Sequence, residues 1–418
     1  MLKSFFVLIT FYWTSFVNGQ DNIKKYVKRN TIPIKTIEPN SRDYSDLEAF
    51  GNSIGNSKIV MLGEQDHGDA ATFLAKTRII KYLHEKKGFN VLAFEADFFT
   101  LNYGWQSVQS GKISSDSLIK KSITALWTNC KACDGLFYQY IPATLKTEKP
   151  LQLTGFDLHM DFVNLFRLLD SVLLSLKLPI TELPEYKSQI FPVITSWYKN
   201  TNDSIANKKV VDYLLEIKTQ MLNKLRADNF WVMVVDNLIQ ANIEFNNWKK
   251  DYWKDMNTRD SQMAVNLNWL DKVKYPKEKI IVWAHSYHVS KFAGHYPEDF
   301  LNVAKPMGSV FTRDTINLKE TYVVGFTSYE GTAGRLFQKS TYQVDKPRFN
   351  SLENWIDKSL DYAFVDFKKY NLLYPNISDN FFMSGAVKGN WYHKNHKAQW
   401  NKIFDGVFYI KKMYSCLE

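Results

Sequence analysis

Apolar runs of strand length alternate with helical patterns along most of this chain, and that alternation limits the possible folds. The runs "KIVMLGE", "NVLAFEA" and "KIIVWAHSYHV" are apolar almost throughout instead of at every second position. Between the first two, "TFLAKTRIIKYLHEKKG" has apolar residues near helical spacing and stops at Gly88. Strands that are buried on both faces and separated by helices predict an α/β fold, with a mostly parallel central sheet flanked by helices.

The N-terminus predicts a targeting segment. Lys3 precedes a short apolar stretch, Phe5 to Phe16, and small residues follow before Gln20. About 12 apolar residues are too few to span a bilayer comfortably. We therefore expect residues 1–19 to be a cleaved signal peptide, the mature chain to be secreted or periplasmic, and no stable membrane insertion after cleavage.

The rest of the chain divides by composition. Residues 20–45 are polar and basic and are expected to be a lead-in segment. Residues 46–418 are expected to form the α/β domain. Within it, the range of about 160–255 is mostly helical in pattern and is predicted to be an insertion that forms a lid or a cleft wall.

Charge and motifs exclude several classes of function. The net charge is +10, from 53 basic and 43 acidic residues, but the lysines are scattered and form no dense block. This pattern favours solubility over nucleic-acid binding. The chain has no G-x-G-x-x-G, no phosphate loop and no G-x-S-x-G nucleophile elbow. We therefore expect no cofactor and no marked serine nucleophile.

Three cysteines are present. Cys130 and Cys133 form a C-x-x-C pair and Cys416 lies far along the chain. A structural zinc site usually needs a second such pair. In an exported protein the pattern favours a local Cys130–Cys133 disulfide, with a redox function as the weaker alternative.

Polar residues, most of them carboxylates and histidines, follow the predicted strands at the points where the strands end. The carboxyl ends of parallel strands meet at one edge of a sheet, where ligands bind. We therefore expect these side chains to converge on one site. By strand, they are Glu64 and His67; Glu95 and Asp97; Asp157 and His159; His285 and His288; and Thr327 and Glu330.

A histidine beside a carboxylate is a general-base arrangement, because the acid fixes the imidazole tautomer and stabilises its charged form. His67, flanked by Glu64 or Glu95, fits that role. His285 and His288 are predicted to share the cavity if their segment curls into a turn. The alternative is one pocket histidine and one structural histidine bonded to a loop carbonyl.

Two other functions remain open at this stage. The same carboxylates and imidazoles could hold a metal ion, which would make the chain a metal-dependent hydrolase. A third class is a non-catalytic protein that binds haem or another small molecule. Two acids beside one histidine argue against pure binding.

Several motifs together resemble the erythromycin esterase family. "LGEQDHGD" is similar to its G-E-x-x-H-G opening, and "KGFNVLAFEAD" to its following strand. "TGFDLH", "NTRDSQMAVNLNWL", "IIVWAHSYHVSK" and "VVGFTSYEGT" match later blocks in family order. The set is specific, although any single block would be weak.

This resemblance implies an α/β hydrolase that cleaves a cyclic ester such as a macrolide lactone. It implies His67 as the general base, Glu64 and Glu95 as its acids, and His285 and His288 as further catalytic residues. Lys76 and Arg259 become candidates for substrate binding, together with Asp157 from the third strand. For Lys76 the plain alternative is an exposed lysine, and for Arg259 it is a salt bridge with Asp260 or a neighbour.

Two departures from the family pattern lie near the expected site. Ala71 stands where the family often has glutamate, and Ser286 where asparagine is frequent. Both leave the machinery that activates water in place, so they bear on which small-molecule ester or lactone is the substrate.

Overall fold

The structure is a computed structural model of the 418-residue chain, and it describes residues 19–158, 162–196, 204–247, 250–292, 294, 303–338, 340–384 and 393–417. The expected signal peptide, apart from Gly19, lies outside these ranges, as does His159. Within them, no helix is both long enough and apolar enough to cross a membrane.

A central sheet organises the fold. Its strand order is β1-β8-β11-β6-β2-β5-β3-β4, with β7 paired to β6 off this path. The strands from β11 to β4 are parallel to their neighbours, whereas β8 is antiparallel to both β1 and β11. The predicted, mostly parallel sheet is thus confirmed. Its strands are β1 Ile32–Ile34, β2 Ile59–Leu62, β3 Phe89–Asp97, β4 Gln152–Asp157, β5 Lys279–Trp283, β6 Thr321–Ala333, β7 Tyr342–Gln343, β8 Tyr362–Asp366 and β11 Gly406–Met413.

The sheet separates two hydrophobic cores, because successive side chains of a strand point to opposite faces. Along β2, Ile59 and Met61 enter one core, and Val60 and Leu62 enter the other. All four side chains are fully buried. This burial on both faces explains why the strands are apolar almost throughout.

Helices cover both faces of the sheet. The helix predicted after the first strand is α3, Ala70–Lys87, and it ends at Gly88, whose φ of 71° lies in the left-handed region that favours glycine. A small sheet of β9, Phe381–Met383, and β10, His396–Ala398, is separate. The other helices outside the insertion are α1 Gly19–Asn30, α2 Glu48–Ile54, α4 Phe98–Gln109, α5 Ser115–Ser122, α6 Ala125–Thr128, α7 Lys131–Asp134, α8 Ile141–Thr144, α13 Tyr252–Trp269, α14 Ser286–Val289, α15 Met307–Phe311, α16 Thr315–Glu320, α17 Phe367–Leu373 and α18 Trp400–Ile403.

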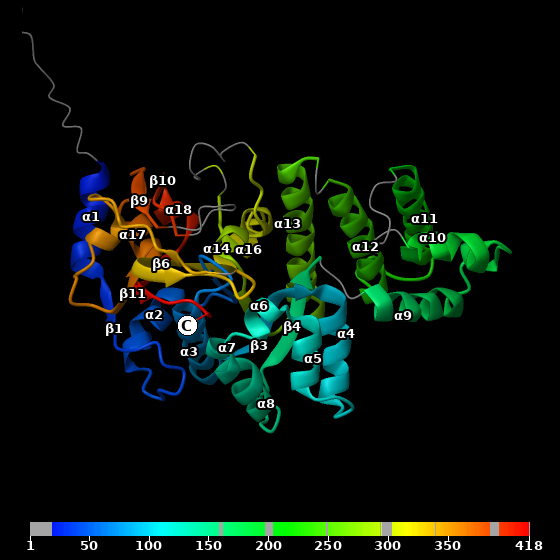
Figure 1. The fold of residues 1–418 in the computed structure, drawn as a ribbon, viewed down its shortest axis with the longest axis horizontal. Helices are drawn as coiled ribbons and strands as arrows, with labels where there is room; N and C mark the ends of the chain where they lie inside the picture. The colour runs from blue at the N-terminus through cyan, green and yellow to red at the C-terminus, as the bar shows by residue number, and fades with distance from the viewer. Residues whose placement is uncertain are drawn as a thin grey trace, which may run out of the picture.

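The range 160–255 is helical where the structure describes it, as predicted. Its helices are α9 Phe162–Ser175, α10 Phe191–Ser196, α11 Ser204–Leu222 and α12 Phe230–Asn247. Figure 1 shows them stacked at the end of the molecule farthest from α1, with α12 beside α13. They therefore support α13 from the side that faces away from the rest of the sheet.

The segment 20–45, expected to be a lead-in, contributes to the sheet. It contains α1 and β1, and Ile32 of β1 pairs with Phe364 of β8. Ile23 and Val27 of α1 are fully buried. These apolar residues lie between lysines, which is why the segment has a polar composition overall.

The predicted disulfide is wrong. Cys130 is bonded to Cys416, 286 residues away, and Cys133 is a free, buried thiol. Both cysteines are buried in the same core, but Cys130 precedes α7 whereas Cys133 lies within that helix. Strand β11 then brings Cys416 to a Cα–Cα distance of 5.3 Å from Cys130.

Candidate active site

The loop between β2 and α3 carries the first group of site residues, and two glycines let it pack closely. A Cβ on Gly63 would lie 2.5 Å from Ser286 Oγ, and one on Gly68 would lie 2.0 Å from the carbonyl oxygen of Gly334. Neither position has room for a side chain. The loop is therefore held tightly against α14 and the end of β6.

Glu64 and His67 form a hydrogen-bonded pair. Glu64 Oε1 lies 2.8 Å from His67 Nδ1, and Glu64 is fully buried. Lys76 Nζ donates to Oε2 at 2.7 Å, and the indole of Trp127 donates to Oε1 at 3.1 Å. A carboxylate only accepts hydrogen bonds, so His67 carries its proton on Nδ1 and its lone pair on Nε2. This is the tautomer that a general base needs.

Lys76 is not the solvated surface lysine of the plain alternative. Its side chain is fully buried, and its ammonium lies 4.0 Å from the centre of the Trp283 ring. Burial lowers the pKa of Lys76 from 10.5 to about 8, although the charge of Glu64 opposes this shift. The lysine thus neutralises the Glu64 carboxylate through Oε2, while His67 contacts the other oxygen, Oε1.

Glu95 is the centre of a second charged group. Its Oε1 accepts a hydrogen bond from Arg259 Nη2 at 3.1 Å and lies 3.3 Å from His288 Nε2. Arg259 also donates two hydrogen bonds to the Asp157 carboxylate, of 2.9 and 2.6 Å. Burial alone would raise the pKa of the Glu95 carboxyl, but His288, His67 and Arg259 outweigh it and hold that pKa well below its usual range.

His288 lies between two carboxylates and is fully buried. Its Nδ1 is 2.8 Å from Asp260 Oδ1, and its Nε2 faces Glu95. Burial acts to lower the pKa of His288, but Asp260 and Glu95 raise it overall. Arg259 and Asp260, adjacent on α13, therefore bind different partners across the site and do not pair with each other by hydrogen bonds.

His285 matches the structural alternative of the sequence analysis. Its Nε2 donates to the carbonyl oxygen of Gln65 at 3.0 Å, and its Nδ1 accepts from the backbone N–H of Tyr287 at 3.1 Å. Both ring nitrogens are thus engaged with backbone groups, and the ring is fully buried. The backbone N–H of His285 also donates to Glu95 Oε2 at 2.8 Å. His285 therefore connects the loop that carries Glu64 and His67 to the charged group around Glu95.

The two charged groups meet at His67 and Glu95. His67 Nε2 lies 4.0 Å from Glu95 Oε1, which is beyond hydrogen-bond length, so no hydrogen bond joins the two side chains. The His67 ring also lies 5.2 Å from the ring of His285. His67 is 7% exposed and Arg259 8%, whereas Glu64 and Lys76 are completely buried. The side chains best placed to meet a small molecule are therefore the imidazole and the guanidinium.

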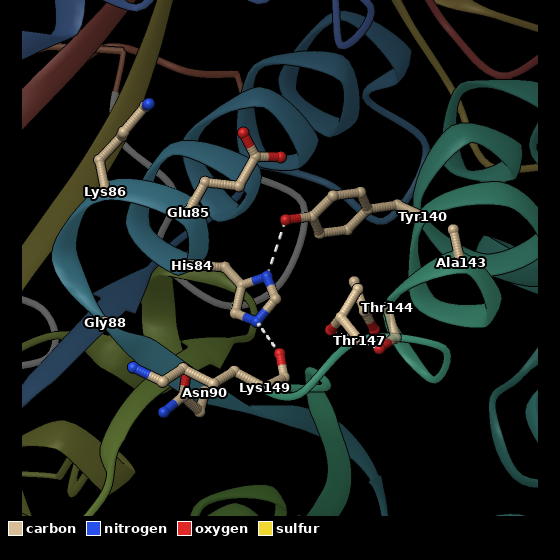
Figure 2. A pocket seen from close by; sticks show the side chains of 10 residues that line it. All are labelled: His84, Glu85, Lys86, Gly88, Asn90, Tyr140, Ala143, Thr144, Thr147 and Lys149. Atoms are coloured by element: carbon tan, nitrogen blue, oxygen red, sulfur yellow. Dashed lines mark hydrogen bonds between the residues drawn. The ribbon is translucent and has the colours of Figure 1, made fainter.

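Not every residue at a strand end joins the site. Thr327 bonds to Glu353, Glu330 is exposed, and Asp97 caps α4 by accepting from the N–H of Thr100. His84 lies in a separate pocket of about 530 Å³, where Tyr140 and the Lys149 carbonyl bond its two nitrogens (Figure 2).

Several site residues were missed from the sequence. Trp127 comes from the short helix α6, and Asp260 was considered only as a partner for Arg259. Behind the β2–α3 loop, His393 bridges Asp69 and Ser328 at 2.9 Å each. Burial raises the pKa of Asp69 despite His393. Asp69 stands in the quoted motif, but nothing near His393 in the sequence indicated a link to this loop.

Among the described residues, no set of three or more histidine, cysteine, aspartate or glutamate side chains is arranged to hold a metal ion. In this site Lys76 forms an ion pair with Glu64, and Arg259 forms an ion pair with Glu95. The electrostatic partners of those acids in this structure are therefore protein cations.

Comparison with known proteins identifies the family. A sequence model described as erythromycin esterase matches residues 84–413. The chain belongs to the erythromycin esterase family. Family membership makes it a hydrolase at the coarse level. The matched range covers Glu95, Asp157, Arg259, His285 and His288 and begins after the loop that carries Glu64 and His67.

Two curated proteins are similar to most of the chain. The chain is 24% identical to "Erythromycin esterase type II" of Escherichia coli, over 93% of this chain and 97% of that protein. It is 26% identical to "Putative hydrolase YbfO" of Bacillus subtilis (strain 168), over 82% and 80%.

Among solved structures, the fold is similar to that of a mutant of the erythromycin esterase EreC in its open conformation. The TM-score is 0.65, the sequence identity is 16%, and the match covers 90% of this chain and 96% of the other. At this identity the likeness concerns the fold alone.

Proposed function

We propose that this family member hydrolyses a carboxylic ester or lactone by direct attack of water, with His67 as the general base. The observation that carries the proposal is the Glu64–His67 pair, whose Nε2 keeps its lone pair, retains some exposure and faces the Glu95–Arg259 group. A proton acceptor held in one tautomer beside a fixed guanidinium suits attack on a carbonyl group.

In the proposed reaction, His67 Nε2 takes a proton from water while the water oxygen bonds to the carbonyl carbon. Glu64 stabilises the resulting imidazolium, and Lys76 holds Glu64 in place. Arg259 donates to the developing oxyanion. Collapse of the tetrahedral intermediate breaks the C–O bond to the alkoxide, which takes the proton back from His67. The products are a carboxylic acid and an alcohol, or one open chain from a lactone.

The remaining residues position these groups. Asp157 and Glu95 orient Arg259, while His288, itself held by Asp260, orients Glu95. His285 fixes the backbone at Gln65, next to Glu64. We therefore assign His285 and His288 to support of the site and not to proton transfer.

A macrolide lactone is the proposed substrate class, supported by the name of the Escherichia coli relative. We also propose that the chain works outside the cytosol, as the N-terminal pattern predicts. The Cys130–Cys416 disulfide supports this, because structural disulfides are rare in reducing compartments.

The test is a screen of lactones and simple esters by mass spectrometry for addition of one water, followed by His67→Asn on each substrate found. The variant should fold normally and lose about 100-fold or more in kcat, the usual size of a lost general base. His84→Asn, at a histidine outside the site, is the matched control and should retain turnover. Parental turnover by His67→Asn would refute the assignment.

A further inference from the structure

We propose that Trp127 is a positioning residue for the Glu64–His67 pair, and that the Cys130–Cys416 disulfide holds it in that place. The inference rests on the proposed function and extends it to a segment outside the sheet. Neither the tryptophan nor the cysteines stand in the motifs quoted above for the family resemblance.

Trp127 contacts both members of the pair. Its Nε1–H donates to Glu64 Oε1 at 3.1 Å, the same oxygen that faces His67 Nδ1. Its ring lies 4.7 Å from the His67 ring at 68°, in an edge-to-face arrangement. The indole is 2% exposed and also packs on Phe94. It therefore limits rotation of the Glu64 carboxylate and covers one side of the imidazole.

The helix that carries Trp127 has little support of its own. Helix α6 spans only Ala125–Thr128, and Thr124 caps it by accepting from the N–H of Leu126. One turn of helix is not stable in isolation. Cys130 follows two residues after this turn, so its disulfide is the nearest covalent anchor.

The other end of the disulfide is attached to the loop of the catalytic pair. The Cys416 N–H donates to the Gly68 carbonyl at 2.9 Å, and the Ala70 N–H donates to the Tyr414 carbonyl at 3.0 Å. Asp69 and Ser415 form a bridge between these two contacts. The segment 414–416 therefore runs along the residues that immediately follow His67.

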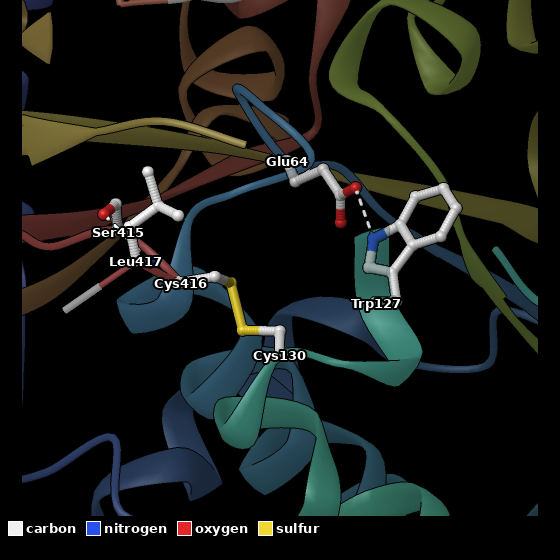
Figure 3. Close-up of a disulfide and its surroundings, with 6 residues drawn as sticks. All are labelled: Glu64, Trp127, Cys130, Ser415, Cys416 and Leu417. Carbon is white, nitrogen blue, oxygen red and sulfur yellow. Dashed lines mark hydrogen bonds between the residues drawn. A yellow bond between two sulfur atoms is a disulfide. The ribbon is translucent and has the colours of Figure 1, made fainter. Parts of the chain in front are cut away.

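One covalent bond thus links the segment that carries Trp127 to the segment 414–416, which is hydrogen-bonded to the loop of Glu64 and His67. Figure 3 shows the Glu64–Trp127 hydrogen bond beside the disulfide, with Cys416 on the strand side and Cys130 on the helix side. When the bond is opened, α6 keeps its cap, its packing and the hydrogen bond that Tyr138 donates to the Thr128 carbonyl, but no covalent link to the segment beside the catalytic loop, so the indole can withdraw from Glu64. Catalytic geometry tolerates such shifts poorly, since a misplacement of about 1 Å can cost about 100-fold in rate.

The first test is Trp127→Phe, which keeps an aromatic ring and removes the N–H donor. We expect kcat to fall by about 10-fold or more with KM nearly unchanged, because the indole is 2% exposed and contacts Glu64 and His67. Trp105→Phe is the matched control: Trp105 is also buried, and it donates to Gln152 at 2.9 Å, outside the site.

The second test is Cys416→Ser, alone and combined with Trp127→Phe. If the disulfide acts through the indole, the double variant should lose no more in kcat than the more impaired single variant. Cys133→Ser, which keeps the disulfide, should retain wild-type kcat. A readout independent of turnover is the indole N–H signal in ¹H–¹⁵N NMR that Trp127→Phe removes, and it should shift in Cys416→Ser.

Wild-type kcat in Trp127→Phe, or a loss that appears in KM instead of kcat, would overturn the positioning role. Additive losses in the double variant, or an unmoved indole signal in Cys416→Ser, would overturn the role of the disulfide. The proposed function fails separately, through an active His67→Asn. If Trp127→Phe does not fold, the kcat of Cys416→Ser against that of Cys133→Ser still decides whether the disulfide supports the site, and equal kcat values in these two variants would overturn the proposal.

Discussion

Lys76 gives the sharpest test of the electrostatics, because its cation is buried without access to water. Replacing it by methionine keeps a long apolar side chain of similar shape and removes the charge beside Glu64. Burial lowers the pKa of Lys76 from 10.5 to about 8. Because the pKa of Lys76 is lower in the folded chain than in the unfolded chain, the unfolded chain binds more protons between these two values, and the free energy of unfolding rises with pH there.

Lowering the pKa from 10.5 to about 8 corresponds to about 3 kcal/mol against folding with the lysine charged. The full cost applies below pH 8, where both states hold the proton, and it disappears above pH 10.5, where both have lost it. The unfolding free energy of the wild type minus that of Lys76→Met should therefore rise by about 3 kcal/mol between pH 8 and pH 10.5.

Urea unfolding at a series of pH values measures this difference, and the subtraction cancels the titration of groups that both proteins share. The exposed Lys112, changed to methionine, is the matched control and should give a flat difference. In parallel, kcat/KM on a verified ester should fall about 10-fold between pH 7 and pH 9 as Lys76 loses its proton. A flat stability difference for Lys76→Met across this window would refute the reasoning.

Three further outcomes follow from the site. Arg259→Met should destabilise the fold by about 3–5 kcal/mol in urea unfolding, because it leaves buried carboxylates unpaired, and adding Asp157→Asn should recover part of that loss. His288→Gln should lower stability most below pH 6.5, and the deficit should shrink as pH rises through the raised pKa of His288; a deficit that grows with pH would contradict this. Gly68→Ala should lower both the melting temperature and turnover, since its Cβ would overlap the Gly334 carbonyl; an unchanged melting curve would argue against that packing.

The strand-end rule accounts for most of what the sequence could predict about the site. Because β2, β5, β3 and β4 are parallel neighbours, the residues that follow them had to meet at one edge. That is how Glu64, His67, Glu95 and Asp157 could be assigned together. The rule failed for Thr327 and Glu330, whose strand β6 continues far past the site edge before it ends.

What the sequence could not give was pairing across long separations. C-x-x-C spacing favoured a local bond, yet the partner of Cys130 is set by where β11 delivers Cys416. Trp127 looked like any core aromatic, since the hydrogen bond to Glu64 depends on how α6 is placed. Nor could composition show that α1 and β1 complete the sheet, because their few apolar residues are hidden among lysines.

The position of β11 has a consequence for how the protein is made. This strand lies between β8 and β6, yet it is synthesised after every other strand. Until residues 406–413 have left the ribosome, the β1–β8 pair has no strand through which to join the rest of the sheet, and one edge of β6 stays unpaired. We expect the nascent chain to depend on chaperones through most of translation, and a stop before residue 406 to give an aggregation-prone fragment, because its unpaired strand edge would remain open to other chains.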